Sequence, residues 1–165
     1  MKFVLASLAA VAFADMEMYQ ANTDFSSNDD SIVISQTSGV QNFTMLAAPM
    51  TYADPDPVQI NNTQKFIIDG IWNIDASDLD YLYFVCHEAS APNVPVYWNY
   101  KYCDTTGENQ CTSPTGTIPE MWSATMTFPV PGVVPSGWTY VVDVKGVSKS
   151  GEEWFVLHSE FQIPS

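Results

Sequence analysis

Apolar and polar residues alternate with a period of two through much of this chain. The clearest case spans residues 122–128, where Trp122, Ala124, Met126 and Phe128 are separated by hydroxyl side chains. Because successive side chains of a strand point to opposite faces, this segment is predicted to be a strand with one buried face. No long stretch repeats its apolar residues at the helical spacing of about 3.6 residues, so the pattern predicts an all-β protein.

Further segments have the length and composition of strands. They are residues 32–34, 41–45, 66–74, 81–86, 97–102, 138–144 and 154–163. Proline-bearing stretches at 52–57 and 129–135 are predicted to be loops, because proline donates no ladder hydrogen bond. The count and spacing of the strands predict an immunoglobulin-like sandwich of two sheets with seven to eight strands.

Three of these strands carry finer expectations. In 66–74 the apolar residues fall on one face, and Gly70 marks a place where another group approaches the backbone closely. Segment 81–86 is apolar on both faces, so one face is expected in the core and the other under a loop or a ligand. In 138–144, Trp138 and the alternate residues after it are expected on one face.

The N-terminal part differs in composition from the rest. Residues 1–14 have the pattern of a secretory signal peptide, with a basic residue, an apolar run and a small-residue cleavage site at 12–14. A buried N-terminal helix is the alternative interpretation. Residues 15–31 are acidic and polar and are expected to be a loosely held segment, which leaves 32–165 as one sandwich domain. A secreted or endomembrane-lumen protein, lysosomal compartments included, follows from the signal.

The charge balance excludes some partners. The chain has five lysines, no arginine and 19 acidic residues, which gives a formal net charge of −14. Nucleic acid and anionic membranes would be repelled, since no basic patch offsets this charge. No apolar run reaches the roughly twenty residues that a transmembrane helix requires, so an integral membrane protein is not expected.

Cysteines and sequons give further expectations. In an oxidising compartment Cys103 and Cys111 are expected to form a disulfide that closes a short polar loop. Cys86 remains, either as a buried free thiol or in an intermolecular disulfide. Two sequons make Asn42 and Asn61 candidate glycosylation sites, which would place both at the surface.

Candidate catalytic groups are few. His87 and His158 each lie in or beside a predicted strand, without a second ligand at metal-binding spacing. No nucleophile elbow and no phosphate-binding loop is present. A carboxylate pair of the glycosidase type remains an alternative, because spacing does not select two of the acidic residues. We therefore expect a non-enzymatic protein with no cofactor, no metal and no catalytic residue.

Large apolar side chains gather where strands meet proline turns, at 94–98 and 128–135. Such turns stiffen the backbone without polar side chains, so a gap beside them would stay dry and accept an apolar ligand. The alternative is that these residues are end caps of a filled core. The pattern alone leaves both open.

The C-terminal part resembles the ML lipid-recognition family. The shared order is a V-P-V-aromatic segment at 94–97, a short Cys-to-Cys loop, a strand that ends in hydrophobe-Pro-Val at 128–130, a further proline, and a last strand that ends in Gln-Ile. The resemblance covers about residues 40–165. It implies a sandwich with slightly splayed sheets and a sterol, fatty acid or other lipid between them.

The resemblance also implies site residues. Trp98 matches an aromatic at the pocket mouth, and Val130 with Val134-Pro135 matches an entrance on the opposite sheet. Cys103 and Cys111 match the cysteines of the family's short loop. The full set expected to contact lipid is Trp98, Tyr97, Val96, Phe128, Val130, Val134, Pro135, Trp122 and Tyr100.

The chain departs from the family pattern at three places. Val156 lies near a position where the family has a cysteine, the loop 47–58 lacks a pair that normally closes it, and Val134 replaces a common tyrosine. These departures leave the ligand unspecified. The expected function is lipid or sterol binding and transfer, with delivery through a protein partner or at a neutral surface. The alternative is a structural or adhesive extracellular module with a filled core.

Overall fold

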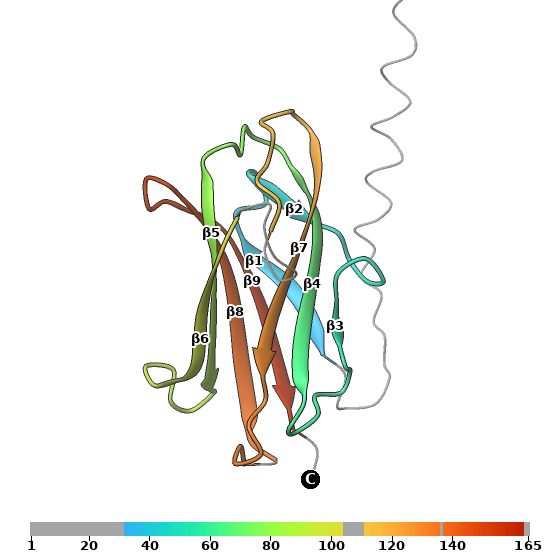
Figure 1. Cartoon of the computed structure of the whole chain (residues 1–165), viewed down its shortest axis with the longest axis vertical. Coiled ribbons are helices and arrows are strands. Elements are labelled where there is room, and N and C mark those ends of the chain that lie inside the picture. Colours follow the sequence, from blue (N-terminus) through green and yellow to red (C-terminus); the bar gives the residue numbers. More distant parts are fainter. Residues whose placement is uncertain (1–31, 104–110, 136, 164–165) are drawn as a thin grey trace, which may run out of the picture.

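Two antiparallel sheets face each other in the computed structural model, which describes residues 32–103, 111–135 and 137–163 (Figure 1). None of these residues is helical. The strands are β1 (Val33–Ser38), β2 (Phe43–Met45), β3 (Tyr52–Asp54), β4 (Thr63–Trp72), β5 (Leu79–Glu88), β6 (Pro95–Tyr102), β7 (Glu120–Pro129), β8 (Thr139–Ser148) and β9 (Glu153–Gln162). The predicted all-β sandwich of two sheets is confirmed.

The described residues form nine strands, one more than the upper expectation. The extra strand is β3, which lies in a segment that the prolines at 55 and 57 assigned to a loop. Its three residues pair with Lys65–Ile67 before Pro55 ends the ladder. A proline stops a strand at its own position and leaves the preceding residues extended, so a short strand fits before it.

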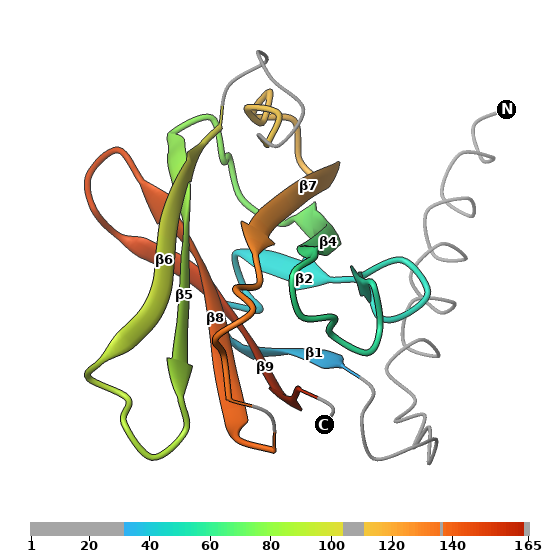
Figure 2. The same cartoon turned by 60° about the horizontal axis from the view of Figure 1, so that its bottom comes forward.

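The larger sheet has the order β1-β9-β8-β5-β6, so β1 and β6 are its edges. The smaller sheet is built around β4, which pairs with β7 over the whole length from Thr63 to Trp72. On its other side, β4 pairs with β2 and β3 in succession. Figure 2 shows β2, β4 and β7 of the smaller sheet in one layer and the strands of the larger sheet in the other.

The core lies between the sheets and consists mainly of inner-facing residues of the long strands. Alternate residues of β4 and β7 are buried, as the period-two patterns predict. A Cβ at Gly70 would lie 2.1 Å from the Phe43 ring, so the predicted close approach is confirmed. The glycine allows the Phe43 ring to lie directly on the backbone of β4.

The finer expectation for residues 138–144 is wrong for Trp138. Trp138 is 53% exposed and precedes β8, because the chain enters the strand only at Thr139 after the turn at Gly137. One face of β5 is buried in the core, as expected. On the other face, Tyr81 and Tyr83 pack against the tyrosine rings of β6 and are half-buried. The expected signal peptide and acidic N-terminal segment, residues 1–31, lie outside the described residues.

Candidate functional site

The residues expected to contact lipid do not lie on one surface. Side chains of β6 alternate between the two faces of its sheet, so Tyr97 is half-buried on the inner face. Val96, Trp98 and Tyr100 point to the outer face, where 55%, 57% and 47% of their surface is exposed. Trp98, which was expected at an inter-sheet mouth, thus lies on the outer face, and its neighbour Tyr97 is the residue that faces the other sheet. In a strand, a shift by one residue reverses the face.

Tyr97 belongs to an inner aromatic cluster with Phe66, Phe84 and Phe128. The centroids of Phe84 and Phe128 lie 4.6 Å apart, and Tyr97 lies 5.6 Å from Phe128 and 5.9 Å from Phe84. Phe66 completes the cluster at 5.9 Å from both phenylalanines. These rings come from both sheets and pack against one another between them. A ligand at this position would have to displace a ring.

The loop after β7 lies at the same end of the sandwich. Val130 is buried, Val134 packs partly buried against the core, and Pro135 is exposed. The Tyr140 hydroxyl donates to the Pro135 carbonyl at 3.1 Å, which ties the loop to β8. The backbone of Val130 also pairs with that of Asn61 and Asn62. Three of the predicted entrance residues thus share this loop.

Trp122 lies toward the other end of β7. It precedes Phe128 by six residues, which corresponds to about 20 Å along a strand. Its ring packs against Phe43 and Trp72, and its Nε1 donates to the Thr112 carbonyl at 2.6 Å. Trp122 is therefore a core residue at the opposite end of the sandwich and does not belong to the inner aromatic cluster.

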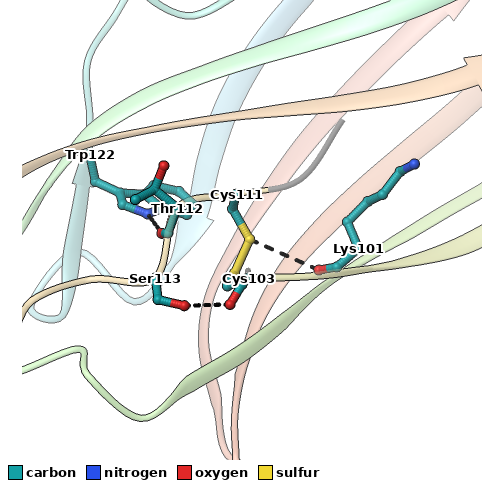
Figure 3. Close-up of a disulfide and its surroundings, with 6 residues drawn as sticks. All are labelled: Lys101, Cys103, Cys111, Thr112, Ser113 and Trp122. Atoms are coloured by element: carbon teal, nitrogen blue, oxygen red, sulfur yellow. Dashed lines mark hydrogen bonds between the residues drawn. A yellow bond between two sulfur atoms is a disulfide. The ribbon is translucent and has the colours of Figure 1, made fainter. Parts of the chain in front are cut away.

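The Cys103–Cys111 disulfide is confirmed and lies beside Trp122 (Figure 3). It joins the end of β6 to the segment that leads into β7. Ser113 Oγ donates to the Cys103 carbonyl, and Cys111 Sγ lies 4.0 Å from the Lys101 carbonyl. The cross-link therefore connects the two sheets at one end. A disulfide of this kind is typical of an oxidising compartment.

Between the disulfide and the loop at 129–135, β6 and β7 are edge strands of opposite sheets, and we define the seam as this pair of edges, which the Tyr97 and Phe128 rings connect. Among the described strands, β6 pairs only with β5, and β7 pairs only with β4. Tyr97 reaches Phe128 across the seam by ring contact. Side chains, not backbone hydrogen bonds, close the sandwich here, so it is easier to open than a paired edge.

Cys86 of β5 lies next to Tyr97 of β6 on the inner face of the sheet, because these two residues are cross-strand partners. The thiol is free and buried. Burial raises the pKa of Cys86 to about 12, since the apolar interior disfavours the thiolate. The prediction of a buried free thiol is confirmed for this structure. The shifted pKa indicates a strongly desolvated environment on the inner side of the seam.

Gln64 is the polar exception in this part of the core. It is fully buried on the inner face of β4, and Phe128 is its cross-strand partner on β7. Its Nε2 donates to the Pro55 carbonyl at 2.8 Å, while Oε1 accepts no hydrogen bond within the described structure. The amide orientation follows from the donor contact, because an oxygen could not donate to that carbonyl.

The outer faces of β5 and β6 carry a second group, here called the outer aromatic row. Tyr83 and Tyr100 stack with centroids 4.8 Å apart, and Tyr81 meets Tyr100 at 5.2 Å. Burial and the neighbouring Tyr100 raise the pKa of Tyr83. The outward residues of the two strands are Tyr81, Tyr83, Val85, His87, Val96, Trp98, Tyr100 and Tyr102. None of them is acidic, although the chain has 19 acidic residues.

The remaining candidates lie apart from these groups. His87 and His158 are strand residues as predicted, and His158 Nδ1 lies 2.8 Å from an oxygen of Asp143. Asn61 is exposed, whereas Asn42 is half-buried and its amide donates to the Trp154 carbonyl at 3.1 Å. The same amide nitrogen would carry a glycan on Asn42, next to this hydrogen bond.

The described residues were compared with the requirements of a metal site and of a membrane-spanning helix. These residues contain no group of three metal-ligating side chains close enough to hold an ion. The same part of the chain contains no helix with the length and apolar composition needed to cross a membrane.

Comparison with known proteins does not assign this chain to a family. No protein-family model matches this chain, and no curated protein matches it. Any function assigned to the chain therefore rests on how its own residues are arranged.

Sequence reasoning missed Gln64 and the outer position of Trp98. A glutamine in the first third of a strand carries no signal of burial, because Lys65 and Thr63 beside it are polar as well. The face of Trp98 was available from the alternation at 97–102, since Tyr97 and Trp98 must point in opposite directions.

Proposed function

We propose that the protein binds an apolar lipid between its sheets, and that the lipid enters at the seam between β6 and β7. The observation that carries this proposal is the half-buried Tyr97 ring, which lies on Phe84 and Phe128 where no strand pairing closes the sandwich. The order of motifs that resembles the ML lipid-recognition family supports the same function. No chemical step is required, so the proposal is for a binding and transfer protein without a cofactor.

Entry requires the Tyr97 ring to leave its place. Since β6 pairs only with β5 among the described strands, outward movement of its Tyr97 end breaks no backbone hydrogen bond to β7, while the disulfide still holds the other end. Burying about 300 Å² of apolar ligand surface corresponds to roughly 7.5 kcal/mol. Opening of the ring contacts and ordering of the ligand reduce this value. Binding in the micromolar range is the expected result.

The net charge of the protein indicates how a bound lipid would be delivered. A protein with a formal net charge of −14 is repelled by anionic bilayers, so transfer would proceed at a neutral surface or through a protein partner. The Cys103–Cys111 disulfide supports a role in the secretory route or outside the cell.

The test uses the full chain, purified without added lipid. Organic extraction and native mass spectrometry should detect copurifying lipid, and a fluorescent sterol should bind to the stripped protein. Tyr97→Ala should speed uptake several-fold, because the ring that the ligand displaces is absent. Trp98→Ala is the matched control on the other face and should leave uptake unchanged. Absence of any lipid and of any sterol binding would overturn the function, and equal effects of both variants would overturn this entrance.

A second candidate function is self-association through the outer aromatic row, as in an adhesive module. The Cys103 N–H donates to the Asp80 carbonyl at 3.0 Å, so alternation directs the backbone groups of Trp98 and Tyr100 away from β5. These residues thus combine exposed rings with an unpaired strand edge. A second copy fits best, because its own edge offers the same uncharged aromatic strand in antiparallel register.

Light-scattering mass measurements test this candidate. Association should strengthen with added salt, because salt screens the repulsion between two acidic copies. Trp98→Thr combined with Tyr100→Thr should abolish it, while Val33→Thr at the opposite edge β1 should not. A monomer at every protein concentration, or an equal effect of Val33→Thr, would refute it.

A further inference from the structure

Gln64, the cross-strand partner of Phe128, has an unused hydrogen-bond acceptor in the core. The side chain is completely buried, its Nε2 is committed to the Pro55 carbonyl, and Oε1 accepts no bond within the described structure. Leaving a buried carbonyl oxygen without a donor costs about 1–3 kcal/mol, so such groups are rare and need an explanation. A bound donor would remove that cost.

The position of Gln64 connects it to the inner aromatic cluster. It is the cross-strand partner of Phe128 on the inner faces of β4 and β7, and Phe66 follows two residues later on the same face. Phe128 in turn contacts Tyr97 at the seam. A ligand that displaces Tyr97 and lies on Phe128 therefore comes beside Gln64.

We propose that Gln64 Oε1 accepts a hydrogen bond from a hydroxyl group of the lipid, so that the preferred ligands are neutral lipids with an alcohol, such as sterols or long-chain alcohols. This inference rests on the proposed lipid-binding function and specifies its ligand class. A carbonyl oxygen can only accept, so the ligand must donate. A ketone at the same place would bring two acceptors together.

Ionised fatty acids are disfavoured by the same geometry. A carboxylate only accepts hydrogen bonds and would face Oε1 without a donor. The buried side chains of the described core include no lysine or histidine that could neutralise it. The desolvated Cys86 next to Tyr97 indicates that a charge in this region is expensive.

The experiment compares cholesterol with its corresponding ketone, and hexadecanol with palmitate, on the stripped full-length protein. Each alcohol should bind at least about tenfold more tightly than its partner, since the partner leaves Oε1 unsatisfied. Gln64→Met removes the acceptor at similar volume and should reduce the alcohol-to-ketone ratio to near one. Gln59→Met, at an exposed glutamine before β4, is the control and should keep the ratio.

A measurement on the unchanged protein keeps the test independent of how Gln64→Met folds. The side-chain amide resonances of Gln64 in a nitrogen-resolved NMR spectrum should shift with hexadecanol and stay in place with hexadecane. If alcohols and ketones bind equally to the unchanged protein, the hydroxyl inference is wrong while lipid binding stands. If none of the four lipids binds, the proposed function itself is wrong.

Discussion

The two faces of the β5–β6 ribbon carry aromatic groups of opposite character. On the inner face, Phe84 and Tyr97 pack with Phe128 of the other sheet. On the outer face, Tyr83 and Tyr100 stack on each other, and Trp98 is largely exposed. The same residue types thus build a core on one side and an uncovered surface on the other. The number of aromatic residues alone does not indicate stability, because the stabilisation from each ring depends on whether the other sheet covers it.

The largest expected effect on stability distinguishes the inner face of the β5–β6 ribbon from its outer face. Phe84→Ala should lower the free energy of unfolding by about 3–5 kcal/mol, because the cluster cannot collapse into the space that the ring leaves. Tyr83→Ala, its neighbour on the outer face, should lower it by only about 1 kcal/mol. Urea unfolding monitored by fluorescence gives both values. Equal losses would mean that the outer row is covered in solution.

The second effect concerns Cys86, which lies on the inner face of β5. Its folded-state pKa of about 12 exceeds the ordinary value of 9.0, so the neutral thiol is favoured in the folded protein. Stability should be complete below pH 9 and fall as the pH rises toward 12, by up to about 4 kcal/mol at full ionisation. Urea midpoints measured across this range would show the decline.

Cys86→Val is the control for this pH dependence. The variant should lose most of the alkaline decline, although a smaller decline should remain because burial also raises the pKa of Tyr140. The native thiol should also resist alkylation at neutral pH and react after unfolding. Rapid alkylation of the folded protein would show that the inner side of the seam is wet.

The third effect concerns the disulfide that joins β6 to the segment before β7. Reduction should lower the free energy of unfolding by about 2.5 kcal/mol, since the closed loop restricts the unfolded chain. The variant with Cys103→Ser and Cys111→Ser should show the same loss and no response to reductant. If the double variant is as stable as the oxidised native protein, the disulfide does not stabilise the fold. A changed slope of the urea curve would show that the compactness of the unfolded state has changed as well.

The smallest effect is expected on the outer face. Trp98→Thr should change the free energy of unfolding of the monomer by less than about 0.5 kcal/mol, because threonine suits a strand and the ring has little buried area to lose. Thermal unfolding at low protein concentration measures it. A loss of more than about 2 kcal/mol would show that Trp98 packs in a covered environment.

Much of the fold was predictable from alternation. The strands at 66–74 and 122–128 were recognised because half of each is buried and half is not, so their residues repeat with a period of two. The close approach at Gly70 and the Cys103–Cys111 pair were also predictable. In contrast, β3 was missed, because three residues beside two prolines are too short to show a pattern.

The candidate site was predicted only in part. Tyr97, Phe128 and Val130 were named and do lie toward one end of the sandwich, but Trp98 and Trp122 were grouped with them and lie elsewhere. Gln64 was not considered at all. A one-dimensional motif records the order of residues, whereas a site depends on the face and the level at which each residue lies.

The amino-acid sequence by itself determined the β class, the positions of the long strands and the disulfide, because these depend on local alternation and on close spacing along the chain. Only the tertiary structure decided which strands are edges, which face of β6 is covered, and that a glutamine lies fully buried beside Phe128. These features depend on which element packs across from which, and pairings between distant parts of the chain leave no local periodic signal.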